Sequence, residues 1–300
     1  MKYKKSLSLL LLIGLCGVLI WYFNKGYNYR ISFKTPQSPG AVYSTLVNWG
    51  TLSTFAVDSA KITSKQPFEE IKQKFYMNDS VFDYMWEIEP INDSLTKVVA
   101  YVNDEANSFD QNLIVPFKKN DFVNRSIKEV KLIRDFITQL HENFKVEIVE
   151  DSIFDVSTKY CAYMPLESKI NQKAGTMATN IGYIMGYIRA NDIELAGEPY
   201  LWVKELDLAN DYIKFDFCFP IQRKDSLPQS QLVKFKDPQD FKAIKAIFNG
   251  NYRSTDFAWF ELMRYAKKQG ISIKEQPLEI FYDDPQSGTD SKDWTAEVFL

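Results

Sequence analysis

The sequence predicts an α+β protein with an apolar N-terminal helix in residues 1–27, followed by two domains, residues 28–150 and residues 151–300. A length of 300 residues fits about two domains. In the first domain, period-two alternation predicts strands, and apolar residues three and four positions apart predict one long helix. In the second domain, a repeated segment indicates two copies of one strand–helix–strand–strand unit.

Residues 6–23 carry no charged side chain and predict a membrane-spanning helix. At about 1.5 Å per residue they cover roughly 27 Å, close to the hydrocarbon core of about 30 Å. Trp21, Tyr22 and Phe23 end the run, as an aromatic belt at a membrane interface would. A cleaved signal peptide is the alternative, but no small-x-small cleavage site follows. We therefore expect a single-pass membrane anchor.

The charges that flank this run predict on which side of the membrane the domains lie. Three lysines precede the run and two basic residues follow it. The positive-inside rule then places the N-terminus in the cytoplasm and the bulk of a bacterial chain on the extracytoplasmic, periplasmic side. Residues 1–30 carry five basic and no acidic side chains, so the rest of the chain is acidic, because the whole has a net charge of −3.

The first domain is predicted to be a sheet packed against one long helix. Residues 31–35, 81–90 and 94–104 predict strands, and the short connection between the last two predicts an antiparallel pair. Residues 40–52 predict a short helix. A helix over residues 121–146 is predicted by an apolar stripe of Val123, Ile127, Val130, Ile133, Ile137, Leu140 and Phe144. We expect the sheet to wrap around this helix.

The run YRISFKTPQSPGAVYSTLVNWGTL, residues 29–52, combines a strand, a proline-containing turn and a helix that carries Trp49. It resembles the opening of START-like domains, which are also called SRPBCC or polyketide-cyclase-like domains. The second tryptophan that is usual in this family is absent from residues 51–55. The resemblance implies a helix-grip fold whose apolar cavity holds a lipid-like or polycyclic ligand. A filled core is the alternative, because aromatic side chains also fill cores.

The second domain contains an internal repeat. Residues 185–203 align without a gap with residues 263–281, which lie 78 positions further along the chain. The aligned pairs include Met185 with Met263, Tyr187 with Tyr265, Ile193 with Ile271, Leu195 with Ile273, and Pro199 with Pro277. Each segment predicts a helix, a polar turn and a strand. Further strands are predicted before and after each segment, at residues 156–164, 212–221, 240–249 and 294–300. The pattern indicates a duplicated β-α-β-β unit.

Three further features accompany this repeat: Gly250 and Tyr252 before the second helix, the run PLEIFYDDP at residues 277–285, and WTAEVFL at residues 294–300. Together with the duplication, they make the domain similar to the GyrI-like effector-binding domain of AraC-type regulators. The resemblance implies a small-molecule-sensing domain. No helix-turn-helix accompanies it in this sequence, which argues against a transcriptional role.

Glu279 is the most informative candidate site residue, because its counterpart in the first copy of the repeat is Leu201. In its predicted strand it shares a face with Phe281. The GyrI-like resemblance implies that an acid at this position lies at the base of an aromatic pocket, where it pairs with a cationic ligand or serves as a general acid or base. An acid among aromatic rings has a raised pKa unless a cation pairs with it. A surface glutamate on an edge strand is the alternative.

Aromatic residues from both copies are expected to share a ligand-binding pocket with Glu279. The candidates are Tyr252, Trp259 and Phe281 from the second copy and Tyr163 and Tyr183 from the first. Such rings stack on a flat organic cation or attract it through cation–π interactions of about 0.5–2 kcal/mol for each good contact. For each ring, packing in the core is the alternative.

The composition excludes several kinds of chemistry. The single histidine, His141, cannot form a zinc site of two or three histidines. Phosphate-binding glycine loops and nucleophile elbows are absent from the sequence. We expect no metal and no cofactor, and the acidic remainder of the chain argues against a nucleic-acid partner. Cys161 and Cys218 are expected to be buried thiols, with a disulfide as the alternative.

We therefore expect a membrane-anchored protein, held through residues 6–23, that recognises a small hydrophobic, amphipathic or cationic organic ligand in an aromatic pocket with a buried carboxylate. One alternative is a small-molecule hydrolase that uses Glu279 as general acid or base, assisted by a tyrosine such as Tyr252. A second alternative is a non-enzymatic structural or interaction module. The sequence leaves the ligand and the oligomeric state open.

Overall fold

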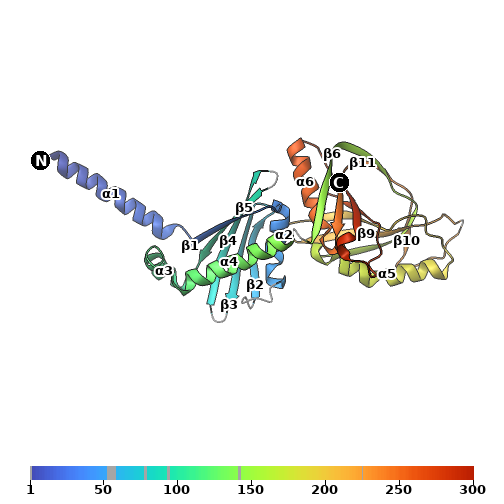
Figure 1. The fold of residues 1–300 in the computed structure, drawn as a ribbon, viewed down its shortest axis with the longest axis horizontal. Coiled ribbons are helices and arrows are strands. Elements are labelled where there is room, and N and C mark those ends of the chain that lie inside the picture. Colours follow the sequence, from blue (N-terminus) through green and yellow to red (C-terminus); the bar gives the residue numbers. More distant parts are fainter. Residues whose placement is uncertain (1, 53–58, 78–79, 93–94, 141–142, 225) are drawn as a thin grey trace. The chain divides into compact units, whose positions relative to one another are not determined.

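The computed structural model describes residues 2–52, 59–77, 80–92, 95–140, 143–224 and 226–300. The chain divides into two compact units, Met1–Thr138 and Gln139–Leu300. Each unit contains one antiparallel sheet and helices, so the predicted α+β class is confirmed (Figure 1). Residue 150, where the sequence pattern divides the chain, lies within the strand β6 (Phe144–Ser157).

The N-terminal helix α1 (Lys2–Asn24) contradicts the membrane anchor predicted over residues 6–23. Among the described residues, no helix has both the length and the apolar character needed to cross a membrane. The predicted single-pass anchor and the periplasmic location derived from it are therefore wrong.

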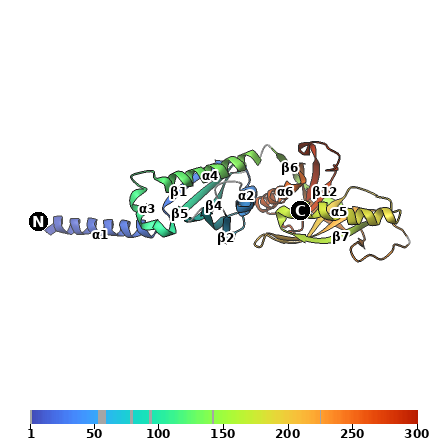
Figure 2. The same ribbon diagram turned by 90° about the horizontal axis from the view of Figure 1, so that it is seen from below.

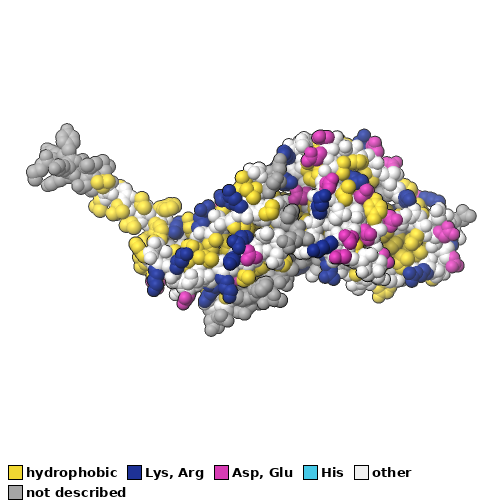
Figure 3. Space-filling view, viewed as in Figure 1, with side chains coloured by type: hydrophobic (Ala, Val, Ile, Leu, Met, Phe, Trp, Pro, Cys, Tyr) yellow, Lys and Arg dark blue, Asp and Glu magenta, His cyan; other side chains and the backbone are white. Residues whose placement is uncertain are grey.

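The aromatic end of α1 contacts another helix of its own unit. The Tyr22 hydroxyl donates a hydrogen bond to the carbonyl of Asn112 (3.0 Å), and the Phe23 ring stacks on Phe109 with 5.4 Å between centroids. Both partners belong to α3 (Ser108–Ile114). These rings therefore tie α1 to α3. The exposed apolar side chains of α1, part of the yellow surface in Figure 3, are Leu11, Leu12, Ile13, Leu15, Val18, Leu19, Ile20 and Trp21.

In the first unit, the strands form a five-stranded sheet in the order β1-β5-β4-β3-β2, and all neighbouring strands are antiparallel. The helix α4 (Asp121–Leu140) lies along one face of this sheet in both ribbon views (Figure 1 and Figure 2). The predicted antiparallel pairing of the strands at residues 81–90 and 94–104 is thus confirmed. The other elements are β1 (Tyr29–Thr35), α2 (Pro39–Leu52), β2 (Ser59–Gln66), β3 (Glu70–Met77), β4 (Ser80–Asn92) and β5 (Leu95–Asn103).

The core of this unit lies between the sheet and α4. The alternating apolar residues of β4 are buried, namely Phe82, Tyr84, Trp86 and Ile88. They belong to one cluster with the apolar stripe of α4, which includes Val123, Val130, Ile133 and Ile137. The Tyr84 ring packs between Phe75 and Trp86, with centroid distances of 4.5 and 5.6 Å. Large aromatic side chains therefore occupy the layer that the periodicity predicts to be buried.

Two local features differ from the predicted elements. The predicted helix of residues 121–146 ends at Leu140, and Phe144 begins β6, where its ring stacks on Phe257 with 4.7 Å between centroids. The apolar spacing continues to Phe144, beyond the end of α4 at Leu140, but Phe144 packs in the second unit. The strands β2 and β3 were not predicted, because a buried Gln73 interrupts the apolar face of β3.

The second unit is built on an eight-stranded antiparallel sheet in the order β10-β7-β9-β8-β12-β13-β11-β6. Its six central strands are mirrored, because β7-β9-β8 is followed by β12-β13-β11. In chain order, β7-α5-β8-β9 and β11-α6-β12-β13 each run strand, helix, strand, strand, as the repeat predicts. The bounds are β7 (Cys161–Ser168), α5 (Lys173–Ala190), β8 (Tyr200–Asp207), β9 (Tyr212–Pro220), β10 (Lys234–Lys236), β11 (Asp240–Gly250), α6 (Asp256–Gln269), β12 (Leu278–Phe281) and β13 (Thr295–Phe299).

The strand predicted over residues 156–164 is divided between two strands. β6 ends at Ser157, and β7 begins at Cys161. Between them, the Thr158 N–H donates to the carbonyl of Gln239 (3.0 Å), and the Thr158 hydroxyl accepts from the Gln239 N–H (2.9 Å). This double contact terminates the pairing of β6 with β11 and redirects the chain into β7.

Candidate functional site

The strand register divides the side chains of the second unit's sheet between two faces. Glu279 of β12 pairs with Leu201 of β8 and with Val298 of β13, so these three side chains point to one face. We call it the helix face, because groups of α5 and α6 lie beside Glu279 on it. Ile280 pairs with Tyr200, and both point to the opposite face.

Glu279 is fully buried on the helix face. Neither of its carboxylate oxygens has a hydrogen-bond partner among the described residues, and the indole nitrogen of Trp259 also lacks one. A buried polar group without a partner costs about 1–3 kcal/mol, and more when it is charged. A carboxylate kept in such surroundings therefore requires either a proton or a favourable electrostatic environment.

A buried ion pair provides part of that environment. Lys173, the first residue of α5, places its Nζ 2.8 Å from an oxygen of Asp256, the first residue of α6. The side chains of the two residues are only 0% and 4% exposed. The Lys173 ammonium also lies 5.2 Å from the ring centroid of Trp259. Because both helices begin here, their N-terminal dipoles add positive potential to that of the lysine.

These neighbours act in opposite directions on the pKa of Glu279. Burial is the largest effect and raises it, the positive charge of Lys173 lowers it, and the negative charge of Asp256 raises it. The net result is a pKa of about 7, against an ordinary value of 4.5. Glu279 is therefore a carboxyl group that exchanges its proton near neutral pH, the property required of a general acid or base.

Two of the predicted site residues, Tyr252 and Phe281, lie together near the end of β12. Their rings are 4.8 Å apart, and the Tyr252 hydroxyl donates to the carbonyl of Thr295 (2.7 Å). Burial raises the pKa of Tyr252 to about 12. Trp259 lies beside Glu279, as described above. Three of the five predicted rings are thus buried in the second copy of the repeat.

The two rings predicted from the first copy are not placed beside Glu279. Tyr183 is 61% exposed on the surface of α5. Tyr163 pairs with Cys218, which pairs with Tyr200, so its side chain points to the face opposite Glu279. The sequence pattern shows that the side chains of each strand alternate between two faces. It does not tell which of the two alternating sets in the first copy faces the helices.

The face opposite the helices carries a second group of rings, which we call the aromatic face: Tyr163, Tyr200, Trp202 and Phe241. Tyr200 and Trp202 are two residues apart on β8 and therefore point the same way. Phe241 of β11 stacks on Trp202 with 5.3 Å between centroids. Tyr200, Trp202 and Phe241 were not predicted as site residues. Tyr200 and Trp202 alternate with Leu201, the counterpart of Glu279, and this alternation is the sequence signal that marks the second face.

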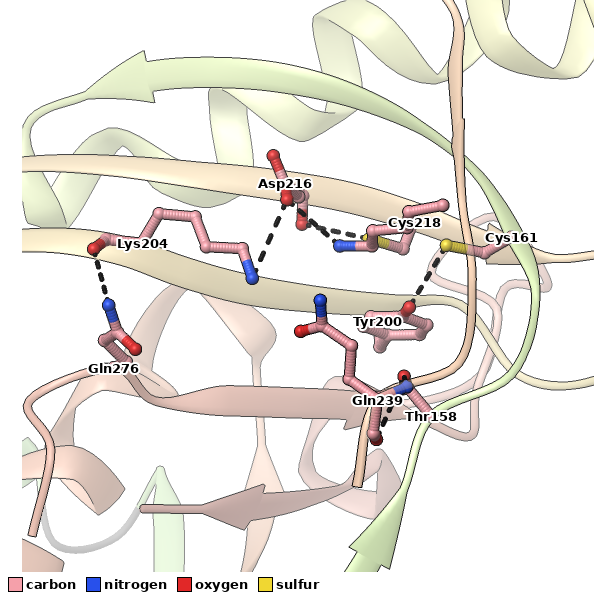
Figure 4. A network of polar contacts seen from close by, with 9 residues as sticks. Thr158, Cys161, Tyr200, Lys204, Asp216, Cys218, Gln239 and Gln276 are labelled. Atoms are coloured by element: carbon pink, nitrogen blue, oxygen red, sulfur yellow. Dashed lines mark hydrogen bonds and ion pairs between the residues drawn. The ribbon is translucent and has the colours of Figure 1, made fainter. Parts of the chain in front are cut away.

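Charged groups accompany these rings, and Figure 4 shows two of them, Asp216 and Lys204, together with Tyr200. Asp216 of β9 is buried, and Lys236 of β10 lies 3.0 Å from its carboxylate while Lys204 lies at 3.9 Å. The Lys204 ammonium sits over the ring of Trp202, 3.3 Å from the centroid. The Lys236 ammonium is within 4.8–5.5 Å of the ring centroids of Tyr163, Tyr200 and Trp202. One acid and two lysines therefore converge on three aromatic rings.

Cys161 and Cys218 lie beside this group as buried free thiols. The sulfur of Cys161 is 3.1 Å from the Tyr200 hydroxyl, and the Cys218 thiol donates to the carbonyl of Asp216 (3.5 Å), as Figure 4 shows. Burial raises the pKa of Cys218 and of Tyr200, so the thiol and the phenol remain protonated at neutral pH. They thus contribute polar contacts without charge.

Two cavities open on the surface of the second unit. One, of about 300 Å³, adjoins the ring of Phe241 and is lined by Asp155, Val156, Ser157, Asp240, Phe241 and Lys242. The other, of about 430 Å³, lies at the start of α5 and is lined by Asn171, Gln172, Gly175, Thr176, Thr179 and Arg253. Glu279 lines neither of these two cavities, whereas the first one contains a ring of the aromatic face.

No family model matches the chain, and no curated protein matches it. Among solved structures, the EcmrR C-terminal domain aligns with 50% of this chain and 95% of its own length, at 17% identity and a TM-score of 0.39. A hydrolase from Listeria innocua aligns with 50% of this chain and 90% of its own, at 11% identity and a TM-score of 0.29. The di-domain ARO/CYC StfQ from the steffimycin biosynthetic pathway aligns with 90% of this chain and 83% of its own, at 9% identity and a TM-score of 0.24. Likenesses this distant assign neither a family nor an activity.

Proposed function

We propose that residues 139–300 form a GyrI-like binding domain that takes a small amphipathic organic molecule on its aromatic face. The observation that carries the proposal is the convergence of Tyr163, Tyr200 and Trp202 with the buried acid Asp216 on one side of the sheet. Binding sites for small molecules are mostly apolar and aromatic, with a few polar groups that orient the ligand. The repeat and the motif at residues 277–285 support the same domain assignment.

The aromatic face suits a ligand with a flat apolar part and one charged or polar group. Phe241 and Trp202 present stacked rings next to the 300 Å³ cavity, which provide apolar contact area. Asp216 pairs with Trp202 in the ladder of β8 and β9 and provides a carboxylate beside these rings. A ligand that uses both features gains stacking energy and an ionic contact.

We propose a START-like fold for the preceding domain. The sequence run at residues 29–52, the antiparallel sheet and the long helix α4 on its face support this assignment. Because the aromatic rings of β3 and β4 pack against each other in the layer beneath α4, we assign the ligand to the second unit.

Fluorescence titration of the full chain tests the ligand-binding proposal. The probes are three aromatic molecules of similar size: tetraphenylphosphonium, the neutral triphenylphosphine oxide, and tetraphenylborate. We expect at least one probe to change tryptophan fluorescence saturably, and W202F to weaken that binding by about tenfold. The matched control is W294F, which replaces a buried tryptophan of the same unit outside the aromatic face. Equal weakening by both variants, or saturable binding of none of the probes, would refute the proposal.

Hydrolysis of a small reactive molecule is a second candidate function, and the orphaned carboxyl of Glu279, with its pKa of about 7, favours it. In this role Glu279 accepts a proton from the attacking water. The test is turnover of an aryl ester and an aryl epoxide by the wild-type chain, by E279Q and by E275Q, which replaces an exposed glutamate nearby. Turnover that E279Q abolishes and E275Q retains supports hydrolysis; turnover that is absent or equal in all three proteins excludes it for these substrates.

A further inference from the structure

We propose that the ammonium group of Lys236 is a built-in competitor that occupies a cation subsite on the aromatic face, and that an organic cation binds there by displacing it. The subsite consists of the rings of Tyr163, Tyr200 and Trp202 and the carboxylate of Asp216. This inference rests on the proposed ligand-binding function and adds to it the class of the ligand's charged group and a means of regulation.

The surroundings of the Lys236 ammonium are those of a bound cationic ligand. Its Nζ is 3.0 Å from Asp216 and lies 4.8, 5.5 and 5.2 Å from the ring centroids of Tyr163, Tyr200 and Trp202. Three rings around one ammonium form the kind of aromatic cage that recognises organic ammonium groups. A lysine that served only to neutralise Asp216 would not need three rings around it.

The segment that carries Lys236 joins the sheet as a short edge strand, in which Phe235 also stacks on Tyr160. β10 has three residues, lies at the edge of the sheet and pairs only with β7. Residues 226–233, which precede it, form neither helix nor strand and are largely exposed. An edge strand with few ladder contacts opens at a low free-energy cost, so its lysine can leave the subsite without disturbing the central strands.

The charge balance of the subsite favours a cation as the replacement. Burial lowers the pKa of Lys236, but the charge of Asp216 and the hydrogen bond to it raise the pKa, so the group is an ammonium at neutral pH. When that ammonium leaves, Lys204, at 3.9 Å, is the one cationic partner that the described part of the chain leaves to the buried Asp216. A ligand ammonium restores the closer ion pair, whereas a neutral ligand leaves the carboxylate undercompensated.

Two lysines of the same short strand provide a matched test. Lys234 and Lys236 both belong to β10, but Lys234 is exposed and has no place in the cage. K236M keeps an apolar side chain of similar length and removes the charge, and K234M makes the same change outside the subsite. We expect K236M to bind tetraphenylphosphonium about tenfold more tightly than the wild-type chain does, and K234M to match the wild type within about twofold.

The neutral triphenylphosphine oxide separates competition between charges from simple opening of space. We expect K236M to change its affinity by less than about twofold. An equal gain for the neutral and the cationic probe would overturn the inference, because it would mean that the substitution only enlarges the site. Equal binding of the cation by wild type and K236M would also overturn it, although the binding function would stand. Binding of no probe by any of these proteins would instead remove the proposed function itself.

Hydrogen exchange on the wild-type chain tests the inference without any substitution. Saturation with tetraphenylphosphonium is expected to speed exchange at the amides of residues 234–236, because β10 is released from β7. Amides of the central strands β8 and β12 serve as the internal control and are expected to remain protected. Unchanged or slower exchange in β10 at saturation would overturn displacement of Lys236.

Discussion

Glu279 and Leu201 pair directly where β12 meets β8, and they are also 78 positions apart, which is the offset of the sequence repeat. The repeat aligns Leu278 with Tyr200, whereas the sheet pairs Leu278 with Trp202. A two-fold axis between Glu279 and Leu201 produces this difference, because it places the residue before Glu279 opposite the residue after Leu201. The two copies of the unit are therefore related by a local two-fold axis that passes between Glu279 and Leu201.

The same symmetry explains why the two copies differ where they meet. Lys173 and Asp256 begin the corresponding helices α5 and α6 and form an ion pair. Two identical charges so close together in a buried place would repel strongly. Likewise, a second glutamate at position 201 would confront Glu279 across the ladder. Complementary side chains near the axis are the physical consequence of packing two copies against each other.

Replacing Glu279 with glutamine should remove a pH dependence of stability. Burial raises the pKa of this group to about 7 from an ordinary 4.5, so between these values the folded chain holds a proton that the unfolded chain releases. The stability of the wild-type chain is therefore highest below the lower value, falls as pH rises to about 7 and stays low above it. The predicted fall is roughly 3 kcal/mol. E279Q should lack this fall and exceed the wild type in stability at high pH.

Urea unfolding at about pH 5 and about pH 8 measures this effect. The control is E275Q, which changes an exposed glutamate of the same segment and should follow the wild-type pH profile. If E279Q and the wild type lose stability in parallel between the two pH values, the raised pKa of Glu279 is disproved.

Breaking the ion pair between Lys173 and Asp256 should be more costly than removing it entirely. Either single variant, K173M or D256L, leaves one buried charge without a partner and should lose about 3–5 kcal/mol of unfolding free energy. The double variant should be more stable than either single variant. For comparison, D155A removes the exposed partner of Lys242, where the side chains are 84% and 75% exposed, and should cost below about 1 kcal/mol. A double variant less stable than both single ones would contradict this expectation.

In the first unit, W49F should destabilise the fold through Glu129. The Trp49 indole donates a hydrogen bond to the buried Glu129 carboxylate (2.8 Å), and the loss of this donor should cost about 1–3 kcal/mol. Burial raises the pKa of Glu129 and Trp49 lowers it, so the variant should raise it further. The carboxylate is then penalised more in its charged form, and the destabilisation should grow from low to high pH. The free energy of unfolding of W49F and the wild type, measured at low and at high pH, checks this pH dependence. The control is W21F, which changes an exposed tryptophan.

A glycine at the junction of β11 and the following turn should not tolerate alanine. Gly250 has a φ of 143°, and an added Cβ would lie 2.6 Å from the Phe144 Cβ and 3.0 Å from the Asn143 carbonyl oxygen. We expect G250A to cost about 1–3 kcal/mol or more. G182A provides the contrast, because its Cβ meets no atom within 4 Å in the interior of α5 and should stabilise the helix by up to about 1 kcal/mol. Thermal denaturation midpoints should shift in opposite directions.

Much of the local structure follows from patterns along the chain. The alternation of Phe82, Tyr84 and Trp86 predicts a strand and its buried face, and the structure confirms both. Where a polar residue such as Gln73 is buried, the same reasoning misses the strand, because its burial depends on partners far away in the sequence. The membrane anchor predicted from the uncharged residues 6–23 is likewise wrong, because no helix among the described residues has the length and apolar character to cross a membrane.

The candidate site was also predicted only in part from the sequence. The repeat identifies Glu279 as a position where an acid replaces the apolar Leu201 of the first copy, and its burial shows that this difference lies inside the fold. The sequence does not identify the cage around Lys236, because β10 lies outside the repeated elements and reaches its partners only through pairing with β7. Asp216 and Trp202 come close to this lysine because β7 pairs with both β10 and β9, and β9 pairs with β8.

By itself, the sequence determined the α+β class, most strands and helices, and the duplicated order of the second unit. Those properties depend on periodicities of about two and 3.6 residues, which neighbouring residues express along the chain. Only the tertiary structure decided which face of each strand the helices cover, why Tyr163 lies opposite Glu279, and which cation occupies the aromatic face. Such properties depend on strand register and on contacts between distant segments, and a local pattern carries no information about either.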